Sequence, residues 1–215
     1  VIFDRENLFL YQIPGGNVFS APVDLAVDAE GYLFVVANHN RHPALLQLDF
    51  DGLFLREVRM SGGPRGLAVP QLSSVAVSPG GTRLYAVDRA NLGLWVADRI
   101  GRARAFVDLA AGLTETERRD LILGKVDVYG DRVLVAVPSR GEIRLFGPDG
   151  AEEGRLGTRG TAPCQLAFPM AAGMDVDGNL VIVDQRRMMF LRWGAEGNRC
   201  LGEHFGLGAA PGYLY

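Results

Sequence analysis

PVDLAVDAEGYLFVVANHNRHPALLQLDFDGLFLREV, residues 22–58, holds four short apolar runs separated by polar turns. The run at 33–36 contains only bulky apolar residues, a pattern typical of a strand that is buried on both faces. The turn VDAEG at 27–31 combines a carboxylate that can bind its own backbone with a glycine that accepts a positive φ. The stretch therefore predicts a four-stranded antiparallel unit.

The same pattern recurs along the chain. Bulky apolar runs stand at 33–36, 84–87, 133–137 and 180–183, at intervals of about 46 to 51 residues, which is the range of propeller blades. Turn-like stretches precede the later runs: VSPGG at 77–81, VYGD at 128–131 and MDVDG at 174–178. The small apolar residues upstream of these turns suit an inner strand near a crowded axis. The repeats predict an all-β fold, a β-propeller of four-stranded blades.

The repeats assign residues 1–215 to a single β-propeller domain. A partial blade is expected at 1–16, full blades at 17–58, 70–107, 122–157 and 169–205, and the lead-in to a next blade at 206–215. An open array would expose apolar faces at both ends, because each repeat buries its faces against its neighbours. We therefore expect either further residues that complete about six blades or a partner that covers the gap.

The pattern resembles that of the NHL-repeat family, a group of six-bladed propellers. Two stretches carry the likeness best: residues 22–58 and GMDVDGNLVIVDQRRMMFLRWGAEG at 173–197. The second blade has Ser78 in place of the turn aspartate, and the third begins without a proline. The resemblance covers nearly the whole chain and implies the propeller fold more specifically than any function. Some family members are metal-dependent peptide-amidating lyases, related propellers are lactonases, and others bind RNA.

Composition narrows the classes of function. The net charge of -3 and the isoelectric point near 5.6 give no global attraction to nucleic acid or anionic lipid. No apolar run reaches the roughly 18 residues of a transmembrane helix. The start at Val1, inside an expected strand, predicts a processed or truncated product. Cys164 and Cys200 form no CxxC motif and either make one disulfide or remain thiols.

One helix is expected among the strands. Thr114 and Glu117 match the capping-box pattern, which predicts a short helix at 115–122, between the second and third blades. We interpret it as a decorated loop.

Two histidines follow the first bulky run. His39 and His42 could supply two metal ligands, but a zinc site needs three or four. The third histidine, His204, is expected on an outer strand. We therefore favour a packing role for the pair and expect no cofactor, while metal ligation by His39 and His42 stays open as the alternative.

An arginine recurs in the loop that follows each bulky run: Arg41, Arg89, Arg140 and Arg186. A closed ring would place these guanidinium groups on one face, where they could hold an anionic partner through bidentate hydrogen bonds. The alternative is that each arginine pairs with an aspartate or with carbonyl groups of a neighbouring blade.

Several aspartates could supply oxygens to a lactonase-like channel site: Asp24, Asp28, Asp88, Asp175 and Asp184. Most of them stand where turn chemistry alone explains an aspartate. The sequence contains neither GxSxG nor the phosphate-loop pattern GxxxxGK[ST].

These observations predict a non-catalytic NHL-repeat propeller that acts as a protein-binding or scaffold module. We expect a protein partner or neighbouring subunits, no nucleic acid, and a periplasmic or extracellular location in a bacterium. The alternative is a metal-dependent hydrolase or lyase, lactonase-like or amidating-lyase-like, with its site at the central channel.

Overall fold

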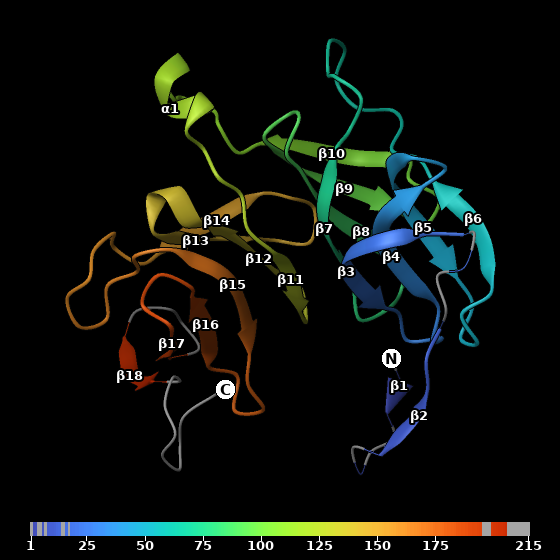
Figure 1. Ribbon diagram of the computed structural model, residues 1–215. Coiled ribbons are helices and arrows are strands. Elements are labelled where there is room, and N and C mark those ends of the chain that lie inside the picture. The colour runs from blue at the N-terminus through green and yellow to red at the C-terminus, as the bar shows by residue number, and fades with distance from the viewer. Residues whose placement is uncertain are drawn as a thin grey trace.

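The computed structural model describes residues 2–3, 6, 8–13, 16, 18–194 and 199–205. They form a two-stranded sheet followed by four four-stranded antiparallel sheets. In each of the four, consecutive strands are hydrogen-bonded neighbours. The sheets stand around a common centre with their first strands innermost, which is a β-propeller arrangement (Figure 1). The expected lead-in at 206–215 lies outside the described residues.

The strands follow the repeat in order. The N-terminal pair is β1 (Ile2–Phe3) and β2 (Phe9–Tyr11). Sheet 1 contains β3 (Ser20–Val27), β4 (Leu33–His39), β5 (His42–Leu48) and β6 (Phe54–Val58). Sheet 2 contains β7 (Leu72–Val77), β8 (Arg83–Asp88), β9 (Gly93–Asp98) and β10 (Ala103–Asp108). Sheet 3 contains β11 (Val126–Tyr129), β12 (Arg132–Val137), β13 (Glu142–Phe146) and β14 (Glu152–Leu156). Sheet 4 contains β15 (Pro169–Met174), β16 (Leu180–Asp184), β17 (Met189–Trp193) and β18 (Cys200–Phe205).

Side chains in the turns bind the turn backbone. Asp28 Oδ1 accepts hydrogen bonds from the backbone N–H groups of Glu30 and Tyr32, at 3.0 and 2.9 Å. The intervening Gly31 has a φ of +88°, a conformation that glycine adopts without steric cost. In sheet 2 the hydroxyl of Ser78 accepts from the Arg83 N–H at 3.1 Å. A serine therefore replaces the aspartate of the repeat without loss of the turn.

The second strands are buried on both faces, as their apolar runs predict. In β12, Val133, Val135 and Val137 pack against sheet 2. The alternate residues Leu134 and Ala136 pack against sheet 4. Because successive side chains of a strand point to opposite faces, one strand contributes to two inter-sheet cores. A similar core joins sheet 1 to sheet 2.

The two ends of the array are less covered. Val23, Leu25 and Val27 of β3 are 53–56% exposed, on the side of β3 that faces away from sheet 2. Val183 of β16 is 36% exposed, whereas the neighbouring Ile182, which faces sheet 3, is fully buried. Each end sheet therefore presents apolar side chains that no described sheet covers.

The helix α1 (Glu115–Arg119) begins at the expected capping box, with reciprocal hydrogen bonds between Thr114 and Glu117. It ends three residues earlier than the expected 115–122. The physical reason is that Leu121 and Leu123 are both buried in the core between sheets 2 and 3. Alternate residues share a face in an extended chain but not in a helix. A 3-10 helix, η1 (Pro138–Arg140), forms part of the loop between β12 and β13.

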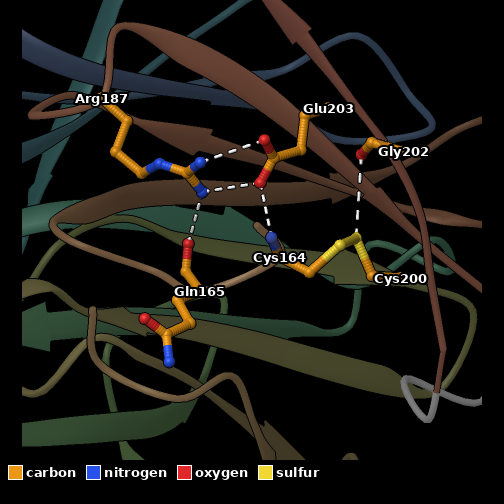
Figure 2. The surroundings of a disulfide bond; sticks show 6 residues. All are labelled: Cys164, Gln165, Arg187, Cys200, Gly202 and Glu203. Carbon is orange, nitrogen blue, oxygen red and sulfur yellow. Dashed lines mark hydrogen bonds and ion pairs between the residues drawn. A yellow bond between two sulfur atoms is a disulfide. The ribbon is translucent and has the colours of Figure 1, made fainter. Parts of the chain in front are cut away.

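One disulfide fixes the connection between sheets 3 and 4. Cys164, in that connection, bonds to Cys200 at the start of β18, with 5.9 Å between the Cα atoms. Figure 2 shows the polar network around it: Arg187 donates to both carboxylate oxygens of Glu203, at 2.8 and 3.0 Å, and to the carbonyl of Gln165. Glu203 also accepts from the Cys164 N–H. Of the two alternatives left open by the sequence, the structure shows the disulfide.

Candidate functional site

The first strands β3, β7, β11 and β15 lie innermost in the array (Figure 1). Residues of all four strands line one cavity, which belongs to the central channel. In each sheet one residue of this inner segment pairs with the fourth residue of the bulky run on the second strand. The four equivalent residues are Asp24, Ser74, Lys125 and Ala171. Two of the four are charged, which is unusual for positions that pack around an axis.

Asp24 joins three sheets at this level of the channel. Its Oδ1 atom lies 2.7 Å from Nζ of Lys125, the only lysine of the sequence. Its Oδ2 atom accepts hydrogen bonds from the Ser74 hydroxyl at 2.5 Å and from the Val75 N–H at 2.9 Å. Lys125 Nζ also donates to the Val23 carbonyl at 2.7 Å. The carboxylate is therefore neutralised and held by protein groups.

Two cavities lie on either side of Lys125. The first, of about 370 Å³, opens where the first strands begin, and we call it the mouth cavity. The second, of about 480 Å³, extends along the first strands toward their ends, and we call it the inner cavity. Lys125 lines both. Among the described residues, the charged ones that line the mouth cavity are Arg89 and Lys125, whereas Asp24 and Asp127 also line the inner cavity.

Asp127 faces the inner cavity at a level where the other first strands carry small residues. Its register equivalents are Ala26, Ala76 and Gly173. The Asp127 side chain is exposed to the channel, but partial desolvation by the surrounding strands raises the pKa of its carboxyl, the negative charge of Asp24 raises it further, and a hydrogen bond from the Val128 N–H opposes both. Asp127 is thus a carboxyl group whose charged form is poorly compensated.

Two other aspartates are structural. Asp88 is fully buried and accepts hydrogen bonds from the N–H groups of Gln71 and Ala90 and from the indole of Trp95. Asp184 is fully buried in the equivalent place and accepts from the N–H groups of Ala167 and Phe168. These carboxylates anchor the segments that lead into β7 and β15.

Charge is segregated between the two ends of the sheets. The loops between second and third strands, 40–41, 89–92, 138–141 and 185–188, contain five arginines and no Asp or Glu. We call them the arginine loops. The turns between first and second strands, 28–32, 78–82, 130–131 and 175–179, contain five acidic residues and no Lys or Arg. We call them the acidic turns. Since neighbouring strands run in opposite directions, the two sets lie at opposite ends of the sheets.

The four predicted arginines differ in their surroundings. Arg140 lies 3.6 Å from a carboxylate oxygen of Glu117 and 3.8 Å from one of Glu142. Within the described part of the chain, the side chains of Arg41, Arg89 and Arg186 are exposed and make no ion pair or hydrogen bond. Arg89 is the one of the four that lines the mouth cavity. Arg140 thus has carboxylate neighbours in α1 and in its own sheet, whereas the other three have none in the described part of the chain.

His39 and His42 flank the two-residue turn between β4 and β5, with ring centroids 6.2 Å apart. The Nδ1 atom of His39 contacts the Val18 carbonyl, and its Nε2 atom accepts from the Asn40 amide at 2.9 Å. His42 lies 3.5 Å from Glu57. Among the described residues, no group of three or more His, Cys, Asp and Glu side chains gathers as a metal site would require. In this arrangement both ring nitrogens of His39 have protein partners.

The pairing of Asp24 with Lys125 was not predicted from the sequence. Asp24 is among the candidate channel oxygens, whereas Lys125 is not among the candidate residues. Alignment of the repeats by their bulky runs does not put the two residues on one level, because Asp24 lies nine residues before Leu33 and Lys125 eight residues before Val133. The turns between first and second strands differ in length, so only the strand register shows that the two positions are equivalent.

Comparisons with known proteins support the fold. No family model and no curated protein matches the sequence. A chain of a nidogen/laminin complex is similar in structure, with a TM-score of 0.61, 17% identity and coverage of 86% of this chain and 65% of that one. Hydrazine synthase from Kuenenia stuttgartiensis has a TM-score of 0.60 and 14% identity, with coverage of 86% of this chain and 49% of that one. A Lactobacillus plantarum protein has a TM-score of 0.61 and 17% identity, with coverage of 89% of this chain and 57% of that one. The chain thus spans about half to two thirds of the length of these structures. At such low identities the likeness concerns the β-propeller fold alone.

Within the described residues no helix is long and apolar enough to cross a membrane.

Proposed function

We propose that this chain is a non-catalytic propeller module that binds a partner protein through its arginine loops. One observation carries the proposal: these four loops hold five arginines and no carboxylate. Three of the guanidinium groups, those of Arg41, Arg89 and Arg186, are exposed and without a partner in the described part of the chain.

The chemistry favours a partner with an acidic surface. A free guanidinium group presents a planar set of donors that fits a carboxylate bidentately. The acidic turns at the opposite ends of the sheets would repel the same partner, so the charge segregation selects which face docks. Such complementarity raises the association rate and fixes orientation more than it raises affinity.

The buried aspartates fit a binding module better than an enzyme. Asp88 and Asp184 hold backbone N–H groups at the start of β7 and β15. Carboxylate oxygens that already accept several N–H hydrogen bonds hold the backbone of their loops and are occupied by protein donors. We assign both residues to the scaffold that positions the arginine loops.

We further propose that the propeller is of the NHL type and has about six blades when complete. The exposed apolar side chains of β3 and β16 support this, because such faces are buried between neighbours in a closed ring. The greater length of the similar solved chains agrees with it. Further sheets or neighbouring subunits would cover Val23, Leu25, Val27 and Val183.

We also propose a periplasmic or extracellular setting in a bacterium. The disulfide between Cys164 and Cys200 supports it, since such bonds persist in oxidising compartments and are rare in the cytosol.

A selection experiment tests the binding proposal. Peptides displayed on phage would be selected against the immobilised chain, and the affinity of the best binder would be measured at two salt concentrations. We expect Asp- and Glu-rich binders whose affinity falls steeply with salt. The double variant Arg41→Glu/Arg186→Glu should lose this binding, and Arg102→Glu/Arg104→Glu, with charges reversed in and beside the outer hairpin of sheet 2, should retain it. Equal loss in both variants, or binders without acidic residues, would refute the proposal.

A metal-dependent hydrolase or lyase at the channel is the second candidate. It is favoured by Asp127, whose carboxyl has a raised pKa and lines a cavity large enough for a small substrate. Metal analysis of the purified chain, with His39→Ala and His42→Ala as variants, tests it. Stoichiometric metal that both variants lose would favour this candidate over the binding module.

A further inference from the structure

We infer that the mouth cavity is a binding site for a carboxylate carried on an apolar body. The cavity lies at the beginning of the first strands, next to the arginine loop 89–92. Its two charged lining residues, Arg89 and Lys125, are both cations. Lys125 is already paired with Asp24, so Arg89 supplies the unpaired positive charge that favours an anion at this cavity.

Hydrogen-bond donors at the mouth cavity lack partners within the described part of the protein. The Arg89 side chain has no partner within the described residues. The Lys125 ammonium group has three N–H donors, and the oxygens of Asp24 and Val23 engage two of them. The buried hydroxyl oxygen of Ser73, which also lines the cavity, has no hydrogen-bond partner in the described structure.

An unpaired buried hydroxyl costs stability. Rotation of the Ser73 side chain toward the cavity would let a ligand bound there complete its hydrogen bonding. A carboxylate has two oxygens with about four lone-pair directions and can accept from all three groups. The remaining wall contains apolar side chains, among them Val36, Leu72 and Met170. The ligand is therefore an acid with an aliphatic or aromatic body and not a bare ion.

This carboxylate has two possible sources: a free small acid, or an acidic group of a docked protein. The second source rests on the proposed function, since the partner would have to sit on the arginine loops. The first source does not, and the site is tested without any partner.

The test is an NMR titration of the isotopically labelled chain with hexanoate, hexylammonium and hexanol at constant ionic strength. We expect hexanoate to shift the backbone amide signals of Leu72, Gly124 and Lys125, and the other two probes to leave them in place. Equal responses to all three probes would overturn the inference. So would inorganic phosphate that binds as tightly as hexanoate, because the apolar wall would then play no part.

Variants distinguish binding at the mouth cavity from a general attraction of hexanoate to positive charge on the chain. Arg89→Gln should weaken hexanoate binding roughly tenfold, as expected for loss of one charge-assisted hydrogen-bond donor. Arg104→Gln, at an exposed arginine of the outer strand β10 in the same sheet, should leave it unchanged. Ser73→Ala should weaken binding while the melting temperature of the free chain stays the same or rises, since an unpaired hydroxyl is removed. Unchanged affinity in both Arg89→Gln and Ser73→Ala would contradict the site.

A competition experiment identifies the source. Hexanoate that displaces the acidic peptide selected against the chain would assign the carboxylate to the partner. Simultaneous binding of both would assign the site to a free acid. If no acidic peptide is found, the proposed function fails, and the hexanoate titration still decides the site.

Discussion

The Nζ atom of Lys125 lies 2.7 Å from Oδ1 of Asp24, so an ion pair joins sheet 3 directly to sheet 1. Sheet 2 separates them along the chain and is bound to the same carboxylate through Ser74. The inner edge of the array is thus held by one acidic side chain of sheet 1 that has partners in sheets 2 and 3. Lys125 also lies between the mouth cavity, which Arg89 lines, and the inner cavity, which Asp24 and Asp127 line.

Replacement of Asp24 should destabilise the chain more than replacement of Lys125. Asp24→Asn weakens contacts to Lys125, Ser74 and Val75, and we expect a loss of roughly 1–3 kcal/mol in the free energy of unfolding. Lys125→Met removes one partner, while the hydrogen bonds of Asp24 to sheet 2 remain. Urea denaturation of both variants measures the difference. A larger loss in Lys125→Met would show that the ion pair, and not the hydrogen bonds, holds the inner edge.

The stability of an Asp127→Asn variant should exceed that of the parent at neutral pH. Partial desolvation and the charge of Asp24 raise the pKa of Asp127 in the folded state. A raised folded-state pKa makes the charged form unfavourable, so stability falls as the pH rises through that value. The asparagine variant lacks this penalty, and its advantage should vanish in acid, where Asp127 is protonated in both states. Thermal melts of parent and variant from acid to neutral pH measure the difference in stability. A variant less stable than the parent at pH 7 would contradict the raised pKa of Asp127.

Loss of the Glu203 carboxylate should have the opposite pH dependence. The hydrogen bonds from Arg187 lower the pKa of Glu203 below its ordinary value of 4.5. The pair is largely buried, with side-chain exposures of 10% and 17%. Glu203→Gln should cost about 1–3 kcal/mol at pH 7, since a charge-assisted bidentate pair is lost. Because a lowered folded-state pKa contributes stability that disappears as the pH falls through it, parent and variant should converge in acid. A difference independent of pH would indicate lost packing instead.

The disulfide should stabilise the connection between sheets 3 and 4. We expect the double variant Cys164→Ala/Cys200→Ala to lose about 2–4 kcal/mol, a typical value for a loop of this size. Denaturation of the parent with and without reductant should give the same difference, and reductant should not affect the variant. A parent that is insensitive to reductant, with thiols shown to be free, would contradict this role.

The repeat made the sheets predictable, because strand burial depends on local patterns. The run at 133–137 packs into two cores, as its unbroken apolar character implies. The end of α1 was wrong in the sequence prediction, because the burial of Leu121 and Leu123 depends on a neighbouring sheet. The pairing of Asp24 with Lys125 depends on the register of strands about a hundred residues apart. No short motif records such a contact, whereas the arginines could be found because they recur at one place in each repeat.

Hydrogen–deuterium exchange of the chain with and without its selected acidic peptide tests whether the arginine loops form the binding face, because the opposite ends of the sheets serve as a control in the same measurement. We expect slower exchange in the arginine loops 40–41, 89–92 and 185–188, with the acidic turns 28–32, 78–82 and 175–179 unchanged. Protection of the acidic turns, with the arginine loops unaffected, would contradict it.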